Sequence, residues 1–351
     1  MKKKVAILIN DIHLNKDNGV VVKDVIAQAV RYAKEKGVRN IIFGGDVFTN
    51  RSGQPLQCLI DFKQILVEYL DGFNIYLIPG NHDKTNPDDY VSYLDVFAGY
   101  RRVTLCQCGS VINMEGVDVV LMPYFSEPKW LAEFKAVQTD LDFDKPTILI
   151  THMAIEGVKN NDGTEVESEL KTKMFAKFDN VLVGHYHNAS KVAENIYYTG
   201  SAYQANFGEN VTDKGFAVIY ADGSFESVRS VFPTYIKHEI DVTDKETLQN
   251  LLEKYDGEDY NHIRFVFRGS KQDCQKINIA EIQGKYGIDC KFVNTDEVEA
   301  VNFSIDDSVS SYDKKSLTKD FISFCSENGI KGERLKQGMN LLKEIKYVES
   351  N

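Results

Sequence analysis

The sequence predicts a layered α/β fold, and three observations lead to this prediction. Short, continuous, apolar runs at residues 5–9, 40–43 and 74–78 are typical of strands that are buried on both faces. Stretches with apolar residues at helical spacing separate these runs, and this alternation implies parallel strands joined by helical crossovers. Beyond residue 90 the strand-like runs come closer together, which suggests a second sheet packed on the first. We therefore expect a β-sandwich flanked by helices.

The two helices expected between the first strands are amphipathic. Gly37 follows the first helix as a stop signal, and Pro55 stands near the start of the second. Their apolar positions at helical spacing are Val22, Val25, Ile26, Ala29, Val30 and Ala33 in the first helix and Leu56, Leu59, Ile60, Leu66 and Leu70 in the second. Further strands are expected at 102–105, 117–122, 147–150, 181–183, 195–198, 215–220 and 225–231.

The 351 residues are enough for a large domain and a smaller one, each with its own core. We expect the large domain at 1–232 and a small α+β domain at 233–294, where strand and helix patterns alternate. The acidic, Ser-rich stretch 295–311 suits a linker. Two amphipathic helical patterns in 312–351 predict a helical hairpin, which fits equally a lid over the chain's own core and a docking element for a partner. Within the small domain we expect strands at 236–242, 263–267 and 288–293 and helices at 245–255 and 272–285.

Composition points to a cytoplasmic globular protein. Apolar residues make up 43% and charged residues 26% of the chain. The N-terminal lysines and the apolar run at 5–9 imitate a signal peptide, but the run is too short and no cleavage site follows. No later run approaches the length of a membrane span. Six scattered cysteines without a Cys-x-x-Cys pair indicate reduced, structural thiols.

The net charge of -11 argues against a protein that binds duplex nucleic acid by bulk electrostatics alone. It leaves room for binding through metal ions, a local basic patch or a partner protein.

Five polar clusters, which contain five of the seven histidines, each follow a strand-like run. Ligands of open α/β sheets bind at the carboxyl ends of the strands, so these clusters should meet at one edge. In Asp11-x-His13 and His185-x-His187 the alternate residues point to the same face of an extended segment. The clusters are Asp11-Ile12-His13, Gly45-Asp46, Gly80-Asn81-His82-Asp83, Thr151-His152 and Gly184-His185-Tyr186-His187.

These residue types suit a hydrolase with two metal ions. Two divalent ions need a bridging carboxylate and a mixed nitrogen and oxygen ligand set, and they clamp the attacking and leaving oxygens of a displacement at phosphorus. Asp46 is the best candidate for the bridge, because the two glycines before it let the backbone come close. Mixed imidazole, carboxylate and amide ligands favour Mn, Fe or Zn over Mg or Ca, and Mn suits oxygen-rich sets.

Each cluster taken singly has an ordinary structural explanation. A lone Asp-x-His is more often a turn or helix cap, and a lone histidine after a strand is more often part of a hydrogen-bonded structure than a ligand. A chance origin, however, has to place five such clusters after five strands of one chain. The sequence therefore predicts a metal site.

These motifs, in this order, resemble the signature of the calcineurin-like metallophosphoesterases, and the resemblance spans residues 5 to about 220. It implies that Asp46 bridges two ions and that His82 acts on the scissile phosphate as a general acid rather than as a ligand. We expect Asp83 to orient the imidazole of His82. The implied ligands are Asp11, His13, Asp46 and His187 for one ion and Asp46, Asn81, His152 and His185 for the other.

A narrower resemblance is to the nuclease subunit of SbcCD-type double-strand-break repair complexes, including the phage recombination endonuclease subunit. It rests on 198–201, 207–209 and 214–216, on the small capping domain, and on the linker with its terminal hairpin. It implies a Mn-dependent DNA exonuclease and endonuclease of DNA repair and recombination. It also implies a homodimer within a heterotetramer, with the hairpin docked on a coiled-coil ATPase of SbcC type. Some members of that family have a second catalytic histidine where this chain has Thr49.

Two other functions fit the same scaffold. A phosphatase or cyclic-nucleotide phosphodiesterase would keep the chemistry and change the substrate. An inactive scaffold that works only by binding is the third possibility, but the intact ligand set with His82 argues against it.

Overall fold

The computed structural model describes residues 2–139, 141–160, 164–295 and 321. The compact unit formed by 1–296 holds all of them except the last. The expected hairpin, and the linker from residue 296 onward, lie outside the described residues.

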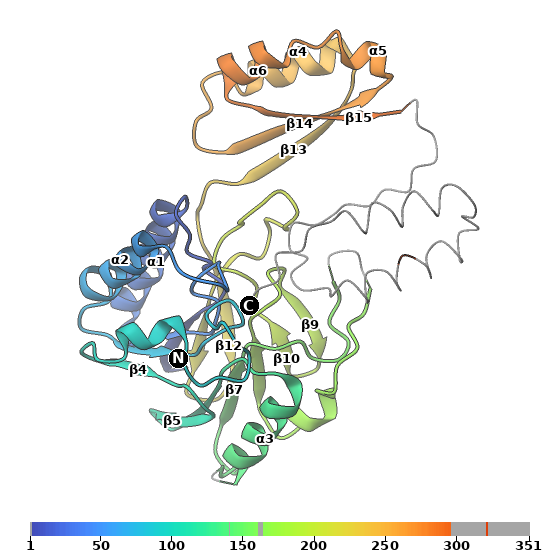
Figure 1. Cartoon of the computed structure of the whole chain (residues 1–351). Coiled ribbons are helices and arrows are strands. Elements are labelled where there is room, and N and C mark those ends of the chain that lie inside the picture. Colours follow the sequence, from blue (N-terminus) through green and yellow to red (C-terminus); the bar gives the residue numbers. More distant parts are fainter. Residues whose placement is uncertain (1, 140, 161–163, 296–320, 322–351) are drawn as a thin grey trace. The chain divides into compact units, whose positions relative to one another are not determined.

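The first sheet has six strands in the order β12-β11-β1-β2-β3-β4. Its two edge strands, β12 and β4, are labelled in Figure 1. Strands β1 to β4 run parallel to one another. Strand β11 is antiparallel to β1, and β12 is antiparallel to β11. The strands are β1 (Lys4–Ile9), β2 (Asn40–Phe43), β3 (Asn74–Leu77), β4 (Val103–Leu105), β11 (Gly215–Tyr220) and β12 (Phe225–Arg229). The connections contain α1 (Gly19–Lys36), α2 (Leu56–Gln64) continued by the π-helix η1 (Ile65–Tyr69), and the 3₁₀ helix η2 (Tyr93–Phe97).

The second sheet also has six strands, in the order β5-β6-β7-β8-β10-β9. Its four middle strands are parallel, and β5 and β9 are antiparallel edges. The strands are β5 (Ser110–Met114), β6 (Val117–Met122), β7 (Thr147–Thr151), β8 (Asn180–Val183), β9 (Ser190–Ala193) and β10 (Ile196–Tyr198). The helices between them are α3 (Glu127–Gln138) and the 3₁₀ helix η3 (Thr172–Phe175).

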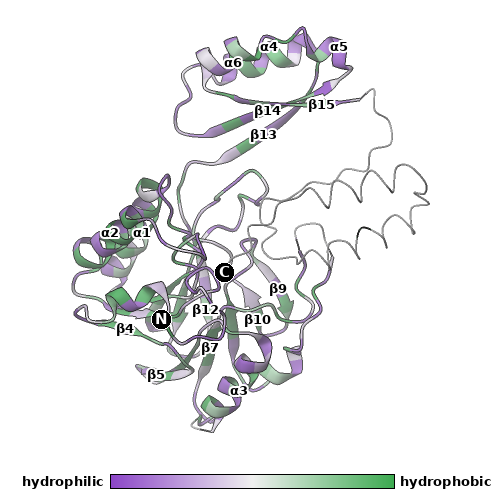
Figure 2. Ribbon diagram, in the orientation of Figure 1, coloured by the Kyte–Doolittle hydropathy of each residue, from purple (hydrophilic) through white to green (hydrophobic). Residues whose placement is uncertain are grey.

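Three apolar clusters show that the two sheets and their helices form layers. Along β1, Ile7 and Ile9 face the cluster shared with α1 and α2, whereas Ala6 and Leu8 face the cluster between the sheets. The third cluster lies between the second sheet and α3 and includes Trp130. Figure 2 accordingly shows much of both sheets in green, while α1 and α2 carry both purple and green residues. Because each central strand is buried on both faces, its sequence is continuously apolar, and the predicted flanked sandwich is confirmed.

Helix α1 forms as its sequence predicts. The six apolar residues expected on its inner face are all buried. The helix ends at Gly37, whose φ of 72° lies in the left-handed region that closes a helix, and its N–H donates to the Ala33 and Lys34 carbonyls. Helix α2 begins directly after Pro55, as expected.

Residues 235–294 form a third, three-stranded parallel sheet with its own apolar cluster around Phe265 and Phe267. Its strand order is β13-β14-β15. The elements are β13 (Tyr235–Asp241), α4 (Lys245–Lys254), β14 (His262–Gly269), α5 (Lys271–Cys274), α6 (Ile279–Tyr286) and β15 (Asp289–Asn294).

The structure differs from the predicted elements at two edge strands and in two helical regions. Strands β5 and β9 were missed because they are half-exposed edges with polar residues, and such edges lack an apolar run. Helix α3 lies between β6 and β7, and the sequence did not predict a helix there. The single helix expected at 272–285 is two helices, because the Ser270 side chain caps α5 and the Asn278 side chain accepts from the N–H of Glu281 at a new helix start.

Among the helices of the described ranges, none is both long and apolar enough to cross a membrane. Within the same ranges Cys58, Cys106, Cys108 and Cys290 form no disulfide.

Candidate metal centre

Five loops that follow strands of both sheets meet at one edge of the sandwich. The loops after β1 and β2 stay paired, because the N–H groups of Asp11 and His13 donate to the Gly45 and Asp46 carbonyls over 3.2 and 3.0 Å. The loop after β8 of the second sheet joins them, since the His185 N–H donates to the Asp11 carboxylate over 3.1 Å. The polar residues of separate strands are therefore held together in one site.

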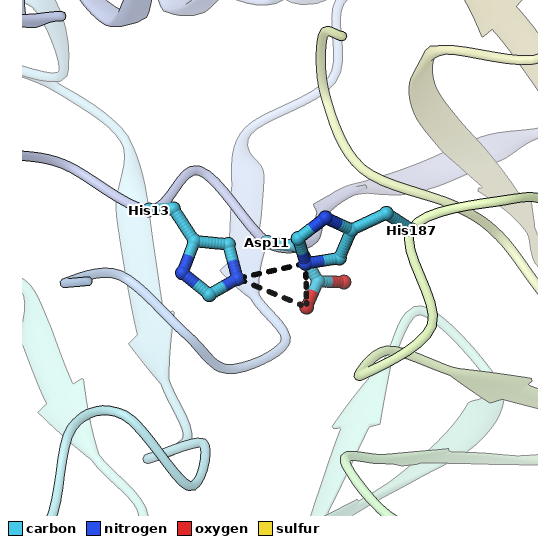
Figure 3. Close-up of side chains that lie close together, drawn as sticks. All are labelled: Asp11, His13 and His187. Atoms are coloured by element: carbon cyan, nitrogen blue, oxygen red, sulfur yellow. Dashed lines mark hydrogen bonds and ion pairs between the residues drawn. The ribbon is translucent and has the colours of Figure 1, made fainter. Parts of the chain in front are cut away.

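The first group consists of Asp11, His13 and His187, whose side chains point toward one another in Figure 3. The Nε2 atoms of His13 and His187 lie 2.9 Å apart. The Asp11 Oδ1 atom lies 3.9 Å from His13 Nε2 and 4.0 Å from His187 Nε2. These three atoms can face one metal ion.

The second group consists of Asp46, His152 and His185. Asp46 Oδ2 lies 3.2 Å from His152 Nε2. The Asn81 side-chain oxygen completes this group, at 2.8 Å from His185 Nδ1 and 3.2 Å from His152 Nε2. Carboxylate, amide and imidazole ligands thus gather at a second point.

Asp46 lies between the two groups. Its Oδ2 atom is 3.4 Å from His13 Nε2 on one side and faces His152 on the other. Its Oδ1 atom accepts from the backbone N–H of His82 over 2.8 Å. One carboxylate therefore faces both groups and also anchors the loop after β3.

Four residues of the site have backbone angles that residues other than glycine usually avoid. The φ values are 51° for Asp11, 41° for His13, 51° for Asp46 and 87° for His185. Each such residue costs about 1–3 kcal/mol and persists where the surroundings impose it, commonly at functional sites. Glycine would relieve this strain but would remove the donor atoms, so the strained backbone supports a functional role for these side chains.

Two glycines give the site its close backbone approach. A Cβ atom at Gly80 would lie 2.2 Å from Asp46 Oδ1, and one at Gly45 would lie 2.3 Å from His152 Nδ1. Gly45 also has a φ of 108°, which favours glycine. Both positions therefore require glycine, as expected for Gly80 and for the pair before Asp46.

His82 stands beside the first group, with its ring centroid 4.9 Å from that of His13. Its Nδ1 contacts the Thr49 carbonyl, and not the Asp83 carboxylate as the sequence led us to expect. Asp83 is fully buried and accepts instead from the backbone N–H groups of Val47, Phe48 and Gly80, over 3.2, 3.0 and 2.9 Å. The reason for the difference is that the Asp83 oxygens are occupied in joining the loops after β2 and β3.

Replacing Asp83 with asparagine is expected to lower the free energy of unfolding by about 1–3 kcal/mol, because the amide nitrogen cannot accept from a buried N–H. Chemical denaturation of the metal-free protein measures this loss. The exposed Asp71→Asn variant is the control and should change stability by less than about 0.5 kcal/mol. Equal unfolding curves for the two variants would show that the Asp83 contacts are dispensable.

The residues that hold His187 lie in 207–209 and 214–216, stretches that carry the narrower resemblance but that the sequence did not assign to the site. The Glu209 carboxylate contacts His187 Nδ1 at 2.8 Å and accepts from Lys214 Nζ at 2.8 Å. Burial opposes the charge of Glu209, but the hydrogen bonds and charges of His187 and Lys214 together outweigh it and lower the Glu209 pKa to about 2. An ionised acceptor at Nδ1 leaves the Nε2 lone pair facing the site. The partners lie in a separate loop after β10, which no local spacing could indicate.

Burial and neighbouring charges set the protonation of the ligands. Burial lowers the pKa of His185 to about 3 and holds that of His13 well below its usual range. Burial alone would lower the pKa of His152 as well, but the Asp46 and Asp11 carboxylates outweigh it and raise this pKa to about 9. Burial would raise the pKa of Asp46, yet the charge of His152 keeps it well below its usual range.

Metal binding between pH 7 and 8 is expected to release protons. His152 carries a proton up to about pH 9 in the metal-free chain, and imidazole binds metal only in its neutral form. Affinity should rise with pH toward that value. Titration calorimetry in two buffers of different ionisation heat counts the released protons, and the His152→Gln variant should release fewer. Equal counts for both proteins would contradict this expectation.

The donor atoms of the site fit divalent metal ions. Buried carboxylates, imidazoles and one amide oxygen meet in two groups that share Asp46, and such mixed donors bind transition-metal ions. Bound ions would polarise a phosphoryl oxygen and a water molecule at the same edge.

Comparisons with known proteins agree with this geometry. The profile of the calcineurin-like phosphoesterases matches residues 5–189. The SbcD subunit of the nuclease SbcCD from Staphylococcus epidermidis is 24% identical over 274 residues, which are 70% of this chain and 72% of that protein. The "Putative phosphoesterase 078R" of Invertebrate iridescent virus 3 is 21% identical over 224 residues, which are 63% of this chain and 64% of the viral protein.

Two solved structures are also similar to this chain, with low TM-scores. A purple acid phosphatase from yellow lupin gives a TM-score of 0.38 at 10% identity, and the match covers 64% of this chain and 46% of the phosphatase. The nuclease MPE of Pseudomonas putida gives a TM-score of 0.28 at 15% identity, and the match covers 62% of this chain and 84% of the nuclease.

The family match includes every residue that the strand-end motifs assigned to the site. It spans more than half of the 351 residues, from before Asp11 to beyond His187. Seven of these residues form the two groups of metal donors, and Asp46 of the second group also faces His13 of the first. This chain therefore belongs to the calcineurin-like phosphoesterase family and is a metal-dependent phosphoesterase.

Proposed function

We propose that this phosphoesterase is a DNA exonuclease and endonuclease subunit that acts in the cytoplasm, in DNA repair or recombination. The observation that carries the proposal is the pair of metal-donor groups at the strand ends with the His82 ring beside them. The similarity to a protein named as part of the nuclease SbcCD supports DNA as the substrate.

In this proposal Asp11, His13, Asp46 and His187 hold one ion, and Asp46, Asn81, His152 and His185 hold the other. Oxygen donors from two carboxylates and one amide favour Mn. When bound, the two ions supply positive charge that activates water and offsets the charge developing on the phosphate. The chain itself supplies the fixed geometry, since backbone hydrogen bonds hold the ligand loops against one another.

His82 donates the proton or hydrogen bond that the leaving oxygen needs. A carbonyl oxygen only accepts, so the contact with the Thr49 carbonyl places a hydrogen on His82 Nδ1. His82 therefore acts as an acid in its imidazolium form, in which Nε2 carries the second hydrogen and gives it to the leaving oxygen. Thr49 thus orients the His82 ring through its backbone carbonyl, at the position where some related nucleases have a second catalytic histidine. Asp83 acts on His82 only by fixing its loop.

The chain is also proposed to assemble with itself and with an ATPase. Residues 233–294 would form the capping domain, and the hairpin at 312–351 would dock on a coiled-coil ATPase of SbcC type. A homodimer would pair through α2 and η1, where Leu56, Ile60 and Val67 keep 72%, 47% and 52% of their surface exposed. Leu56 and Ile60 are four residues apart in α2 and so lie on one helical face, and Val67 adds exposed apolar surface in η1.

Degradation of linear duplex DNA by the purified, metal-free chain after addition of Mn tests the nuclease proposal. We expect Mn-dependent cleavage that EDTA abolishes, together with slower turnover of a small phosphodiester. Rapid hydrolysis of cyclic nucleotides or phosphomonoesters with no cleavage of linear or single-stranded DNA would contradict the nuclease function and favour a phosphatase or cyclic-nucleotide phosphodiesterase.

Deletion of residues 312–351 tests the docking proposal. The truncated protein should keep its metal content and its hydrolysis of a small phosphodiester but no longer copurify with a coiled-coil ATPase. Persistence of the complex after the deletion would refute the docking role.

A further inference from the structure

Arg51 is a positive charge close to the metal centre that has no ion pair with any described residue. It lies in the loop after β2, two residues beyond the Thr49 carbonyl that contacts His82. Its own carbonyl accepts from the Tyr93 hydroxyl over 2.8 Å, which fixes the backbone at this point. Its Nε atom is buried and lacks a hydrogen-bond acceptor among the described residues.

A buried donor without an acceptor costs about 1–3 kcal/mol, and the cost is larger for a charged group. This chain has a net charge of -11, so carboxylates that could neutralise an arginine are plentiful. None of those in the described part of the chain forms an ion pair with Arg51. The arrangement therefore suits an anion that comes from outside the chain.

Tyr124 lies beside the second ligand group. Its ring stacks on His185 with centroids 6.1 Å apart and planes at 26°, and it meets His152 edge-on at 6.4 Å. Two hydrogen bonds hold its backbone, because its N–H donates to the Pro79 carbonyl over 2.9 Å and its carbonyl accepts from buried Lys84 over 2.6 Å. The phenol hydroxyl has no hydrogen bond with any described residue.

Arg51 lies close enough to Tyr124 and His82 for its charge to act on both side chains. The backbone agrees with this placement, because the Thr49 carbonyl two residues before Arg51 contacts the His82 ring. One guanidinium thus acts on both the proposed proton donor and the tyrosine.

We propose that Arg51 and Tyr124 bind the nonbridging oxygens of the substrate's phosphate beside the two metal groups. A guanidinium offers two parallel N–H donors that match the oxygens of a phosphate, and a phenol adds a third donor. This proposal rests on the proposed function for its substrate class, a phosphodiester. It assigns to Arg51 the selection of an anionic substrate and to Tyr124 the orientation of that substrate over His185.

The experiment compares Arg51→Ala and Tyr124→Phe with the wild type, using bis-p-nitrophenyl phosphate as substrate and inorganic phosphate as inhibitor. Arg51→Ala should lower kcat/KM by about 10²–10³-fold, as the loss of a transition-state donor does, and Tyr124→Phe by about 10-fold. The inhibition constant of phosphate should rise in both variants. Metal content and melting temperature should stay at wild-type values, which a merely structural role would not predict.

Arg101→Ala is the matched control, because Arg101 is exposed and far from the motif loops in sequence. Wild-type kcat/KM and wild-type phosphate inhibition in metal-loaded Arg51→Ala and Tyr124→Phe would overturn the proposal. If Arg51→Ala does not fold, Arg51→Gln is measured with the same two criteria. Neither small ligand is DNA, so this test does not depend on nuclease activity. If the wild type hydrolyses the small diester but not DNA, the proposed nuclease function is refuted, and the roles of Arg51 and Tyr124 can still be tested.

Discussion

Asp46→Asn is expected to lower phosphodiester turnover by about 10³-fold or more, because it removes the one charge shared by both ligand groups. Asp46 Oδ2 lies 3.4 Å from His13 Nε2 and 3.2 Å from His152 Nε2, so an amide there would weaken both sites at once. The metal content of the variant, measured by mass spectrometry after dialysis, should fall below that of the wild type. Steady-state hydrolysis of a small phosphodiester gives the rate.

The control for this substitution is Asp71→Asn, which changes the same functional group on the exposed surface. It should match the wild type in both metal content and turnover. If the Asp46→Asn protein retained two ions and full activity, the proposed bridging role of Asp46 would be wrong.

His82→Ala is expected to lower the hydrolysis of DNA by about 10²–10⁴-fold, the usual contribution of a general acid. Metal content should stay near the wild-type value, because His82 Nδ1 is held by the Thr49 carbonyl and the four assigned ligands of each ion remain. The loss should be much smaller for bis-p-nitrophenyl phosphate, since p-nitrophenolate leaves without needing a proton.

This dependence on the leaving group separates proton donation from simple positioning. An equal loss for both substrates would indicate that His82 binds the phosphate but does not protonate the leaving oxygen. Loss of metal from His82→Ala would instead make His82 a ligand, which its proximity to His13 and Asp46 permits geometrically. His238→Gln is the control, because His238 lies on β13 of the third sheet and its ring contacts the Tyr255 hydroxyl.

The layered fold and the chemical nature of the site are predictable from the sequence. Runs such as Ile41-Ile42-Phe43 are apolar at every position because β2 is buried on both faces, and this pattern is visible without a structure. Polar residues directly after such runs could be assigned to one edge, because parallel strands end on the same side. The ligand types then indicated metal chemistry.

Which atoms meet in the site depends on long-range packing and is visible in the structure alone. Thr49, rather than Asp83, contacts the His82 ring, because the Asp83 oxygens are used by backbone N–H groups from two loops. Glu209 reaches His187 from a loop 22 residues further along the chain, and the Arg51 Nε atom is left without an acceptor among the described residues. Such contacts depend on how separate loops pack against one another, and the periodicity of a single chain segment carries no information about that packing.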